Sequence, residues 1–295
     1  HNYCKNVEDY KINFINFLLS TGALKVGGDF TLKSKRVSSW FVNVGDFNDG
    51  NSTGILGQFY ADSILSSREQ IDLVYGIPEK GNALAVATSI GLAGKGKIAN
   101  WFFTRKIPKE YGEGTNLLRD ERIKALVVGK APKDGQSIVQ LDDVFTAGDA
   151  KYEAREVLQG LGDFKLPLLV IAVDRQEVGI DGKSAIEEYE KRTGTKVSSI
   201  VTALEIYNFL RMNPNGIKAH DLERMARYFR VYGTQTIKGS IDTLEQVIVS
   251  RDKSVIPACD VSTLEELEEI VNACSDIDGI GGFKIGFELG LGYGL

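Results

Sequence analysis

Apolar residues along this chain gather in short runs, and longer stretches between the runs repeat apolar positions every three or four residues. Each short run predicts a buried strand, and the runs span 71–76, 98–104, 136–141, 166–173 and 196–201. Helical spacing follows over 82–94, which ends in glycine, and over 150–162. Strands that alternate with helices predict a largely parallel α/β sheet covered on both faces. Ligands of such sheets bind at the carboxyl ends of strands, and the segment after 136–141 lies in such a place.

The two ends of the chain show different patterns. The stretch 12–20 is apolar but short, and its flanks are acidic and polar, so we predict a core-facing amphipathic helix rather than a signal peptide. A further strand is expected at 254–261 and an amphipathic helix at 263–274. The polar residues from Gly233 to Ser254 are expected to connect this second part to the first.

Composition narrows the class of protein. The length of 295 residues suggests one large domain or two smaller ones, and 43% apolar with 25% charged residues is ordinary for a soluble globular protein. A net charge of −5 argues against a general nucleic-acid binder, and no apolar run approaches the ~18 residues of a membrane span. Three cysteines without CxxC spacing favour a reduced, cytoplasmic protein. Because the only histidines are His1 and His220, a divalent ion is expected to have oxygen ligands.

The run 136–141 ends in two adjacent carboxylates, Asp142 and Asp143, and a small turn follows at once. Successive backbone N–H groups from Thr146 to Ala150, at the start of a helix, predict a site for a phosphate. The carboxylates then fit the hydroxyl groups of a sugar and a hydrated Mg²⁺. A sugar phosphate that carries a diphosphate meets both requirements. The alternative is a strand end followed by a capped helix, with solvated aspartates.

Basic residues in three other loops are candidates for the same site. Arg105, Lys106 and Lys109 lie in a segment with two glycines, which suggests a mobile lid whose cations clamp a diphosphate leaving group. Lys80, in a turn after a strand, is a candidate for a further phosphate contact. Arg175 follows a buried strand and suits a carboxylate ligand. The alternatives are solvated loops and a surface salt bridge.

The segment 30–45 contains Lys33 and the aromatic pair Trp40 and Phe41. These rings suit a planar base, but aromatic residues in strands more often belong to the core. The pattern alone leaves both roles open.

Taken together, these segments resemble orotate phosphoribosyltransferases. The matching stretches occur in the order FTLKSKRVSSWFVNVGDFNDG, LGQFYADSIL, KGNALA, TRKIPKEYGEGTNL, LDDVFTAGDA and VDRQEVG, followed by the segment up to about residue 202. The resemblance covers roughly residues 10 to 233 and implies the type I phosphoribosyltransferase fold, a largely parallel sheet flanked by helices, with a hood. It also implies that the phosphoribosyl group of phosphoribosyl pyrophosphate (PRPP) is transferred to orotate with Mg²⁺ as cofactor. The products are orotidine 5′-monophosphate and pyrophosphate, in de novo UMP synthesis.

The resemblance also implies a role for each matching residue. Asp142 and Asp143 resemble the pair that holds the ribose hydroxyls. The 5′-phosphate is expected at Thr146, Ala147, Gly148, Asp149 and Ala150, and PRPP is also expected to contact Val144 and Phe145. The pyrophosphate is expected to face Lys80, Arg105, Lys106 and Lys109, and Arg105 and Lys109 join the two aspartates as expected catalytic residues. Orotate is expected at Lys33, Phe41, Thr146 and Arg175. No direct protein ligand to Mg²⁺ is expected, because PRPP and water supply its ligands.

In family members the mobile loop serves the neighbouring subunit's site, which implies a homodimer, and neither nucleic acid nor membrane is expected as a partner.

The chain departs from the family's pattern at a few positions. Tyr111 stands in place of a usual histidine, Asp149 in place of a hydroxyl or small residue, and Lys35 and Ser39 in place of a common glycine and proline. A carboxylate at 149 would repel phosphate unless it turns outward, for example to cap the helix. The segment 117–136 is longer than expected and is predicted to form a hairpin beside the lid.

The C-terminal segment resembles the start of orotidine 5′-monophosphate decarboxylase, a TIM barrel. Asp260, at the end of a first strand, resembles its ribose-contacting aspartate, and Lys284, in a second strand, resembles the first charge of its catalytic network. The alternative is a pair of strand-end charges. About 40 residues cannot close a barrel of ~250 residues, so no decarboxylase activity is expected. The expected domains are a transferase over 1–233, a linker over 234–253 and a truncated barrel start over 254–295, as in bifunctional UMP synthases.

Two competing functions keep the fold. A regulator would sense PRPP and bind RNA or DNA, but the lid cations and Arg175 favour catalysis and the acidic net charge disfavours nucleic acid. A second enzyme would use a purine base. Lys33 and Arg175, both at positions matched to the orotate site, oppose that alternative.

Overall fold

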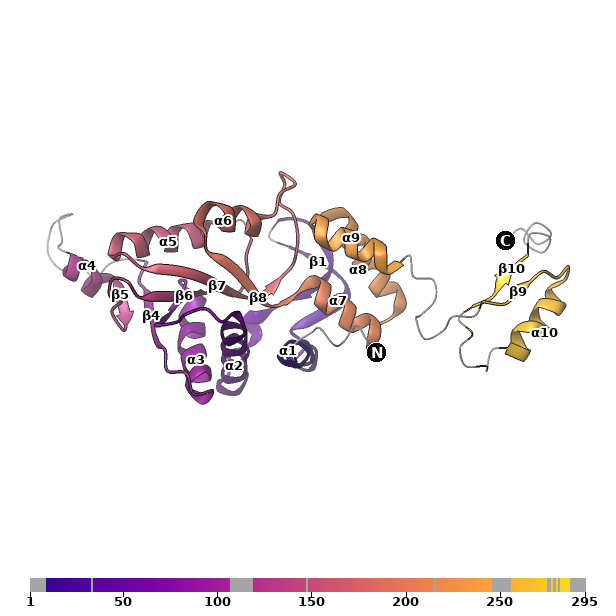
Figure 1. Cartoon of the computed structure of the whole chain (residues 1–295), viewed down its shortest axis with the longest axis horizontal. Coiled ribbons are helices and arrows are strands. Elements are labelled where there is room, and N and C mark those ends of the chain that lie inside the picture. The colour runs from indigo at the N-terminus through magenta and orange to yellow at the C-terminus, as the bar shows by residue number, and fades with distance from the viewer. Residues whose placement is uncertain are drawn as a thin grey trace. The chain divides into compact units, whose positions relative to one another are not determined.

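The computed structural model describes residues 9–32, 34–106, 119–146, 148–214, 216–245, 256–274, 277, 280 and 282–286. The chain divides into two compact units, one up to Lys238 and one from Gly239 onward. Figure 1 shows the first unit as a twisted sheet with helices on both of its faces.

The first unit is built on a six-stranded sheet with the order β5-β4-β3-β6-β7-β8. Its strands are β3 (Leu73–Gly76), β4 (Asn100–Thr104), β5 (Val127–Gly129), β6 (Ser137–Leu141), β7 (Lys165–Asp174) and β8 (Lys196–Thr202). All neighbours pair in parallel except β4 and β5, which are antiparallel. The five strands predicted from apolar runs are confirmed, because each run coincides, within two residues at either end, with one strand of this sheet.

Helices cover both faces of the sheet (Figure 1). α2 (Gly50–Ser67) and α3 (Gly81–Gly94) lie on one face, and α5 (Asp149–Leu161) and α6 (Ala185–Thr193) lie on the other. The core beneath α5 and α6 joins side chains from β3, β4, β6 and β7 to both helices, and its largest members are Tyr75, Phe102, Leu169, Leu158 and Tyr189. The predicted layering of strands and helices is therefore confirmed.

A hairpin and four helices pack beyond the β8 edge and form the hood. β1 (Leu24–Thr31) pairs antiparallel with β2 (Val37–Val42), and α8 (Ala219–Tyr232) packs against both strands. The remaining elements are α1 (Asp9–Ser20), the short 3-10 helix η2 (Val44–Asp46), α7 (Ala203–Met212) and α9 (Gln235–Glu245). α1 buries Phe14, Ile15 and Leu18, as predicted for a core-facing helix.

Two segments differ from the prediction. The expected hairpin over 117–136 is instead α4 (Arg119–Leu126) followed by β5, which extends the sheet antiparallel to β4. The expected connector after Gly233 contains the helix α9, which runs across the division between the two units. Ile237 of α9 is fully buried, so this helix contributes to a packed core rather than acting as a free linker.

The second unit contains β9 (Ala258–Cys259), α10 (Leu264–Cys274) and β10 (Lys284–Ile285). β10 pairs in parallel with β9, so these elements form one β–α–β unit. The strand and the helix predicted here are confirmed, although the strand is shorter than its apolar run. None of the helices that the structure describes is both long enough and apolar enough to cross a bilayer.

Candidate active site

Two carboxylates lie at the carboxyl end of β6, in the middle of the sheet. Every residue of β6 is buried, and the strand has parallel neighbours on both sides. The pairing continues past the strand, because the Asp142 N–H donates to Val170 O at 3.1 Å and the Ala172 N–H donates to Asp143 O at 3.1 Å. Asp142 and Asp143 are therefore fixed by their backbones, and they are only 7% and 8% exposed.

Each carboxylate is paired with a lysine from a different segment. Lys80 Nζ lies 2.6 Å from Asp143 Oδ2, and Lys151 Nζ lies 2.6 Å from Asp142 Oδ2. Lys80 comes from the turn between β3 and α3, and β3 is the parallel neighbour of β6, so the carboxyl ends of two adjacent strands meet here. The structure thus brings three of the sequence-predicted site residues together.

The lysines act against the effects of burial. Burial raises the pKa of Asp142, and Lys151 opposes that rise through its charge and its hydrogen bond. The hydrogen bond to Asp143 raises the pKa of Lys80, which keeps this ammonium group protonated. The site therefore holds two acidic groups that stay close together because each has a cationic partner.

The turn after β6 leads directly into α5. The Val144 N–H donates to Asp143 Oδ1 at 2.8 Å, which ties the start of the turn to the carboxylate. Gly148 is the N-cap of α5 with a φ of 89°, a conformation that favours glycine. Glycine provides no side-chain acceptor for the first amides of α5, and these amides carry the positive end of the helix dipole. This turn is therefore suited to an anion that accepts from backbone N–H groups.

The other described residues of the turn differ in how much of their surface is exposed. Phe145 is half-buried, whereas Thr146, Asp149 and Ala150 are exposed. Ala147 lies outside the described residues. The suggestion that Asp149 caps α5 is wrong, because Gly148 holds the cap position and Asp149 is the first residue of the helix. Its side chain is turned to solvent, as phosphate binding at this turn would require.

Of the predicted lid residues, the structure describes Arg105 and Lys106. Arg105 NH1 donates to the carbonyl oxygens of Ala125 and Val127, at 3.2 and 3.3 Å, so its guanidinium is engaged by the α4–β5 segment. Lys106 Nζ lies 3.4 Å from Glu79 Oε1, and both side chains are exposed. Glu79 is the neighbour of Lys80, so Lys106 lies beside the loop that carries Lys80. Lys109 and Tyr111 lie outside the described residues.

Arg175 joins the end of β7 to the hood. Its Nε donates to Glu177 Oε1 at 2.7 Å and its NH2 donates to Ser38 Oγ at 3.1 Å. Its guanidinium also lies 4.0 Å from the centre of the Trp40 ring. Arg175 thus makes a salt bridge, the alternative considered for it, but a partly buried one, with Glu177. Its contacts with Ser38 and Trp40 bind the hood hairpin.

The aromatic pair of the hood is divided between two environments. Trp40 is fully buried against Phe229 of α8, at 5.9 Å between ring centres, so it belongs to the core. Phe41 is half-buried and stacks on Phe30 at 5.8 Å. Lys33, the third predicted hood residue, lies outside the described residues.

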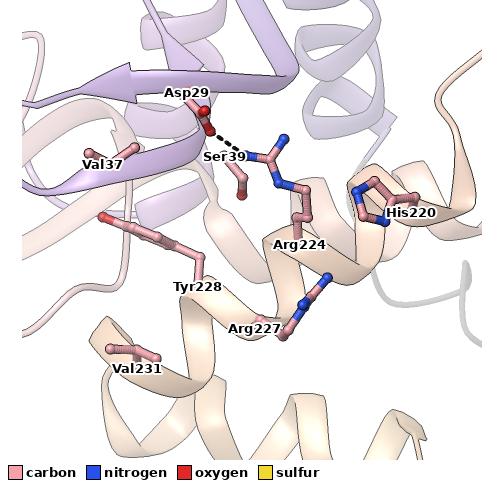
Figure 2. A pocket seen from close by; sticks show the side chains of 8 residues that line it. All are labelled: Asp29, Val37, Ser39, His220, Arg224, Arg227, Tyr228 and Val231. Carbon is pink, nitrogen blue, oxygen red and sulfur yellow. Dashed lines mark hydrogen bonds and ion pairs between the residues drawn. The ribbon is translucent and has the colours of Figure 1, made fainter.

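Figure 2 shows a cavity of about 440 Å³ between the hood hairpin and α8. Arg224 crosses it to pair with Asp29 and also donates to Gly27 O at 3.0 Å. The cavity is lined by Asp29, Val37, Ser39, His220, Arg224, Arg227, Tyr228 and Val231. None of these residues belongs to the β6–α5 segment, so this cavity is separate from the paired carboxylates.

Sequence reasoning missed two residues that hold the carboxylates. Tyr60 of α2 is fully buried and its hydroxyl donates to Asp142 O at 2.8 Å. Burial and the two nearby carboxylates raise its pKa, so the hydroxyl remains a donor. The burial of Lys151 could have been predicted from the sequence, because Lys151 lies three and seven residues before Ala154 and Leu158, on the same face of the helix. All three residues are buried.

Comparisons with known proteins agree with this architecture, although no protein-family model matches the chain. The orotate phosphoribosyltransferase of Methylococcus capsulatus is 37% identical over 229 residues, which cover 77% of this chain and 100% of that protein. The enzyme of the same name from Klebsiella pneumoniae is 38% identical over 228 residues, with coverage of 77% and 100%.

Solved structures give the same result. The crystal structure of orotate phosphoribosyltransferase from Francisella tularensis superposes with a TM-score of 0.64 at 29% identity, covering 75% of this chain and 100% of that one. UMP synthase from Leishmania donovani shares the fold, with a TM-score of 0.55 at 20% identity over 74% of this chain and 42% of that one. The first unit has the type I phosphoribosyltransferase fold, and the chain belongs to the orotate phosphoribosyltransferase family.

Proposed function

We propose that this chain transfers the phosphoribosyl group of PRPP to orotate, forming orotidine 5′-monophosphate and releasing pyrophosphate, in de novo UMP synthesis. The main structural support for this proposal is one arrangement of side chains and backbone amides. Two buried carboxylates, each paired with a lysine, directly precede a turn whose amides begin a helix. The chain is similar over the full length of proteins named for this reaction.

PRPP fits the site from two sides. Its 5′-phosphate would bind backbone amides of the segment from Thr146 to Ala150, at the positive end of α5. Its ribose hydroxyls would donate to Asp142 and Asp143. Lys80 is mostly exposed, with 62% of its side chain accessible, so it can exchange Asp143 for a phosphate oxygen.

The reaction replaces one bond at the anomeric carbon by another. The bond to the diphosphate oxygen breaks while a bond to a ring nitrogen of orotate forms, through an oxocarbenium-like transition state. The carboxylates stabilise positive charge on the sugar, and Lys80, Arg105, Lys106 and Lys109 stabilise negative charge on the departing pyrophosphate. Orotate, held by Lys33, Phe41, Thr146 and Arg175, is the nucleophile once its nitrogen is deprotonated, so no protein nucleophile is required.

The donor set is compatible with a Mg²⁺ ion that PRPP itself carries. Both carboxylates already have lysine partners, and among the described residues no group of three His, Cys, Asp or Glu side chains is arranged around a common point. Mg²⁺ bound by the diphosphate and water would neutralise charge on the leaving group.

We expect the reaction to occur in the cytoplasm, since the described cysteines Cys259 and Cys274 are free thiols.

We also propose a homodimer in which each lid closes over the partner's site, because the family resemblance implies it. Static light scattering of the purified chain would test this, and the mass of one chain would contradict it.

For the second unit we propose the beginning of a decarboxylase-like barrel. A parallel β–α–β unit is the repeating element of such barrels, and β9, α10 and β10 form one. Asp260 follows β9 and Lys284 opens β10. The Asp260 carboxylate lies against Gly286, where an added Cβ would be 2.7 Å from Oδ1, so the ends of the two strands are adjacent. One β–α–β unit is a small part of such a barrel, which contains eight strands.

The proposed transferase activity can be tested by following the loss of orotate absorbance with PRPP and Mg²⁺. We expect orotate to be consumed with one equivalent of pyrophosphate released, and adenine or hypoxanthine to remain unchanged. The double variant Asp142→Asn/Asp143→Asn should lose at least about 100-fold in kcat/KM, since two charge-assisted contacts are weakened. PRPP binding without turnover would favour the regulator, and consumption of a purine would favour the other enzyme; either result would overturn the proposal.

A further inference from the structure

Lys151 occupies an unfavourable place for a lysine. It lies in the first turn of α5, at a buried position of that helix, and is only 5% exposed. A positive charge near a helix N-terminus opposes the helix dipole, and burial of an ammonium group costs free energy unless it is paired. Its contacts must therefore offset both effects.

Those contacts connect the two ends of the phosphate-binding turn. Lys151 Nζ lies 2.6 Å from Asp142 Oδ2, at the end of β6, and donates to Val144 O at 2.6 Å, at the start of the turn. Its backbone N–H donates to Gly148 O at 2.9 Å, at the end of the turn. One residue thus ties the strand, the turn and the helix together.

The two lysines of the site differ in what they can reach. Lys80 is largely exposed, whereas the Lys151 side chain is 6% exposed and its Nζ already has two oxygen partners. Lys80 is free to leave Asp143 for an incoming phosphate. Lys151 lies beneath the turn, where its role is to hold other groups rather than to contact the ligand.

The Asp142 carboxylate depends on this support. Oδ1 accepts from the Asp143 N–H at 2.8 Å, and Oδ2 is paired with Lys151. Burial raises the pKa of Asp142, and the charge of Lys151 is the largest influence that acts against this rise. Without Lys151, the buried carboxylate would lose its cationic partner and one of the two contacts that set its direction.

We propose that Lys151 is a positioning residue for phosphoribosyl transfer, which fixes the Asp142 carboxylate and the phosphate-binding turn in the geometry that PRPP requires. This inference rests on the proposed function and identifies what keeps its central site assembled. The PRPP-binding step should depend on Lys151 more strongly than the binding of the base, which meets this turn only at Thr146.

Lys151→Met tests the inference, because methionine keeps most of the length of the side chain and removes the charge. We expect KM for PRPP to rise about tenfold and kcat to fall by about tenfold or more, with a smaller rise in KM for orotate. Lys95→Met is the matched control. Lys95 pairs with Asp62 at 2.7 Å between α3 and α2, and neither residue belongs to the site. This variant should therefore keep kcat and both KM values.

A purely structural role for Lys151 predicts a different result. The melting temperature would then fall while kcat and KM of the folded enzyme stayed at the parent values, and that outcome would overturn the inference. The double variant Asp142→Asn/Lys151→Met removes both charges and avoids an unpaired buried carboxylate. We expect it to be no more impaired than Asp142→Asn alone, whereas additive losses would show that Lys151 does not act through Asp142.

Binding of PRPP alone, measured by calorimetry, separates this inference from the proposed reaction. If the parent chain binds PRPP but does not consume orotate, the proposed reaction is wrong. The inference would still be supported by about tenfold weaker PRPP binding in Lys151→Met, and it would be overturned by equal binding.

Discussion

Asp149 places a negative charge where the fold offers a positive potential. It is the first residue of α5, it is exposed, and it lies beside the helix amides that the 5′-phosphate would use. An acidic residue at this place stabilises the helix by about 0.3–1 kcal/mol through the helix dipole. The same charge repels an anion bound at the helix start. Stability and ligand binding therefore make opposite demands on this residue.

We predict that Asp149→Thr lowers KM for PRPP by about two- to fivefold, because removing the charge removes the repulsion. The helix start should weaken slightly, so the free energy of unfolding should fall by no more than about 1 kcal/mol. Steady-state kinetics and urea denaturation measure the two effects. Glu156→Gln makes the same change in charge two turns further along α5, and it should leave KM unchanged. An unchanged or higher KM in Asp149→Thr would contradict the prediction.

At the scale of elements, α2 and α3 approach each other backbone to backbone. A Cβ on Gly57 would lie 2.4 Å from Ala87 O, and a Cβ on Gly91 would lie 2.6 Å from Gly57 O. This crossing has a consequence for the site, because α3 begins directly after Lys80 and α2 carries Tyr60, which donates to Asp142 O. Close packing of the two helices therefore helps to place Tyr60 against the Asp142 backbone and Lys80 beside the Asp143 carboxylate.

Two glycines of the same helix provide a matched test. Gly57→Ala forces α2 and α3 apart, and we expect it to lower the free energy of unfolding by about 1–3 kcal/mol. A Cβ on Gly54 meets nothing within 4 Å, so Gly54→Ala should raise that free energy by up to about 1 kcal/mol through helix propensity. Urea denaturation of both variants measures the difference. Equal effects of the two substitutions would show that the crossing is not tight.

Elements with a clear apolar pattern were predictable from the sequence, and those without one were not. β3 and β6 are buried at every position, and β7 is buried over 168–173, which makes these strands short apolar runs. β4 and β8 are only partly buried, but they keep enough apolar residues to be recognised. α4, with the sequence RDERIKAL, has too few apolar residues to reveal a helical face. α9 is polar and contains a glycine, and its signal was limited to three apolar positions at helical spacing, Ile237, Ile241 and Leu244. Ile237 and Ile241 are buried.

The candidate site was predictable in part for a similar reason. Asp142, Asp143 and Lys80 follow strands that are adjacent and parallel, so topology brings them together once the strands are known. Lys151 and Tyr60 act from helices, and their partners depend on how those helices pack. Packing of this kind is a tertiary property that local sequence patterns do not specify.

At the scale of the whole molecule, the question is where the transferase unit ends. The division between the two compact units falls after Lys238, within α9. The start of α9 belongs to the first unit, because the Thr234 N–H donates to Gln176 O at 2.8 Å and Ile237 is fully buried. Gln176 follows Arg175 directly, so α9 begins beside the residue that joins β7 to the hood.

We therefore predict that a chain of residues 1–245 keeps the kcat and KM of the full chain, whereas a chain of residues 1–233 is destabilised. Loss of the buried Ile237 alone should remove about 2–5 kcal/mol from the free energy of unfolding. Thermal melting and orotate consumption of the two truncated chains test the two halves of this prediction. Loss of activity in 1–245 would mean that the second unit contributes to transfer. Equal melting temperatures would instead mean that α9 adds nothing to the transferase unit, and the domain would end at Gly233, as the sequence pattern alone predicts.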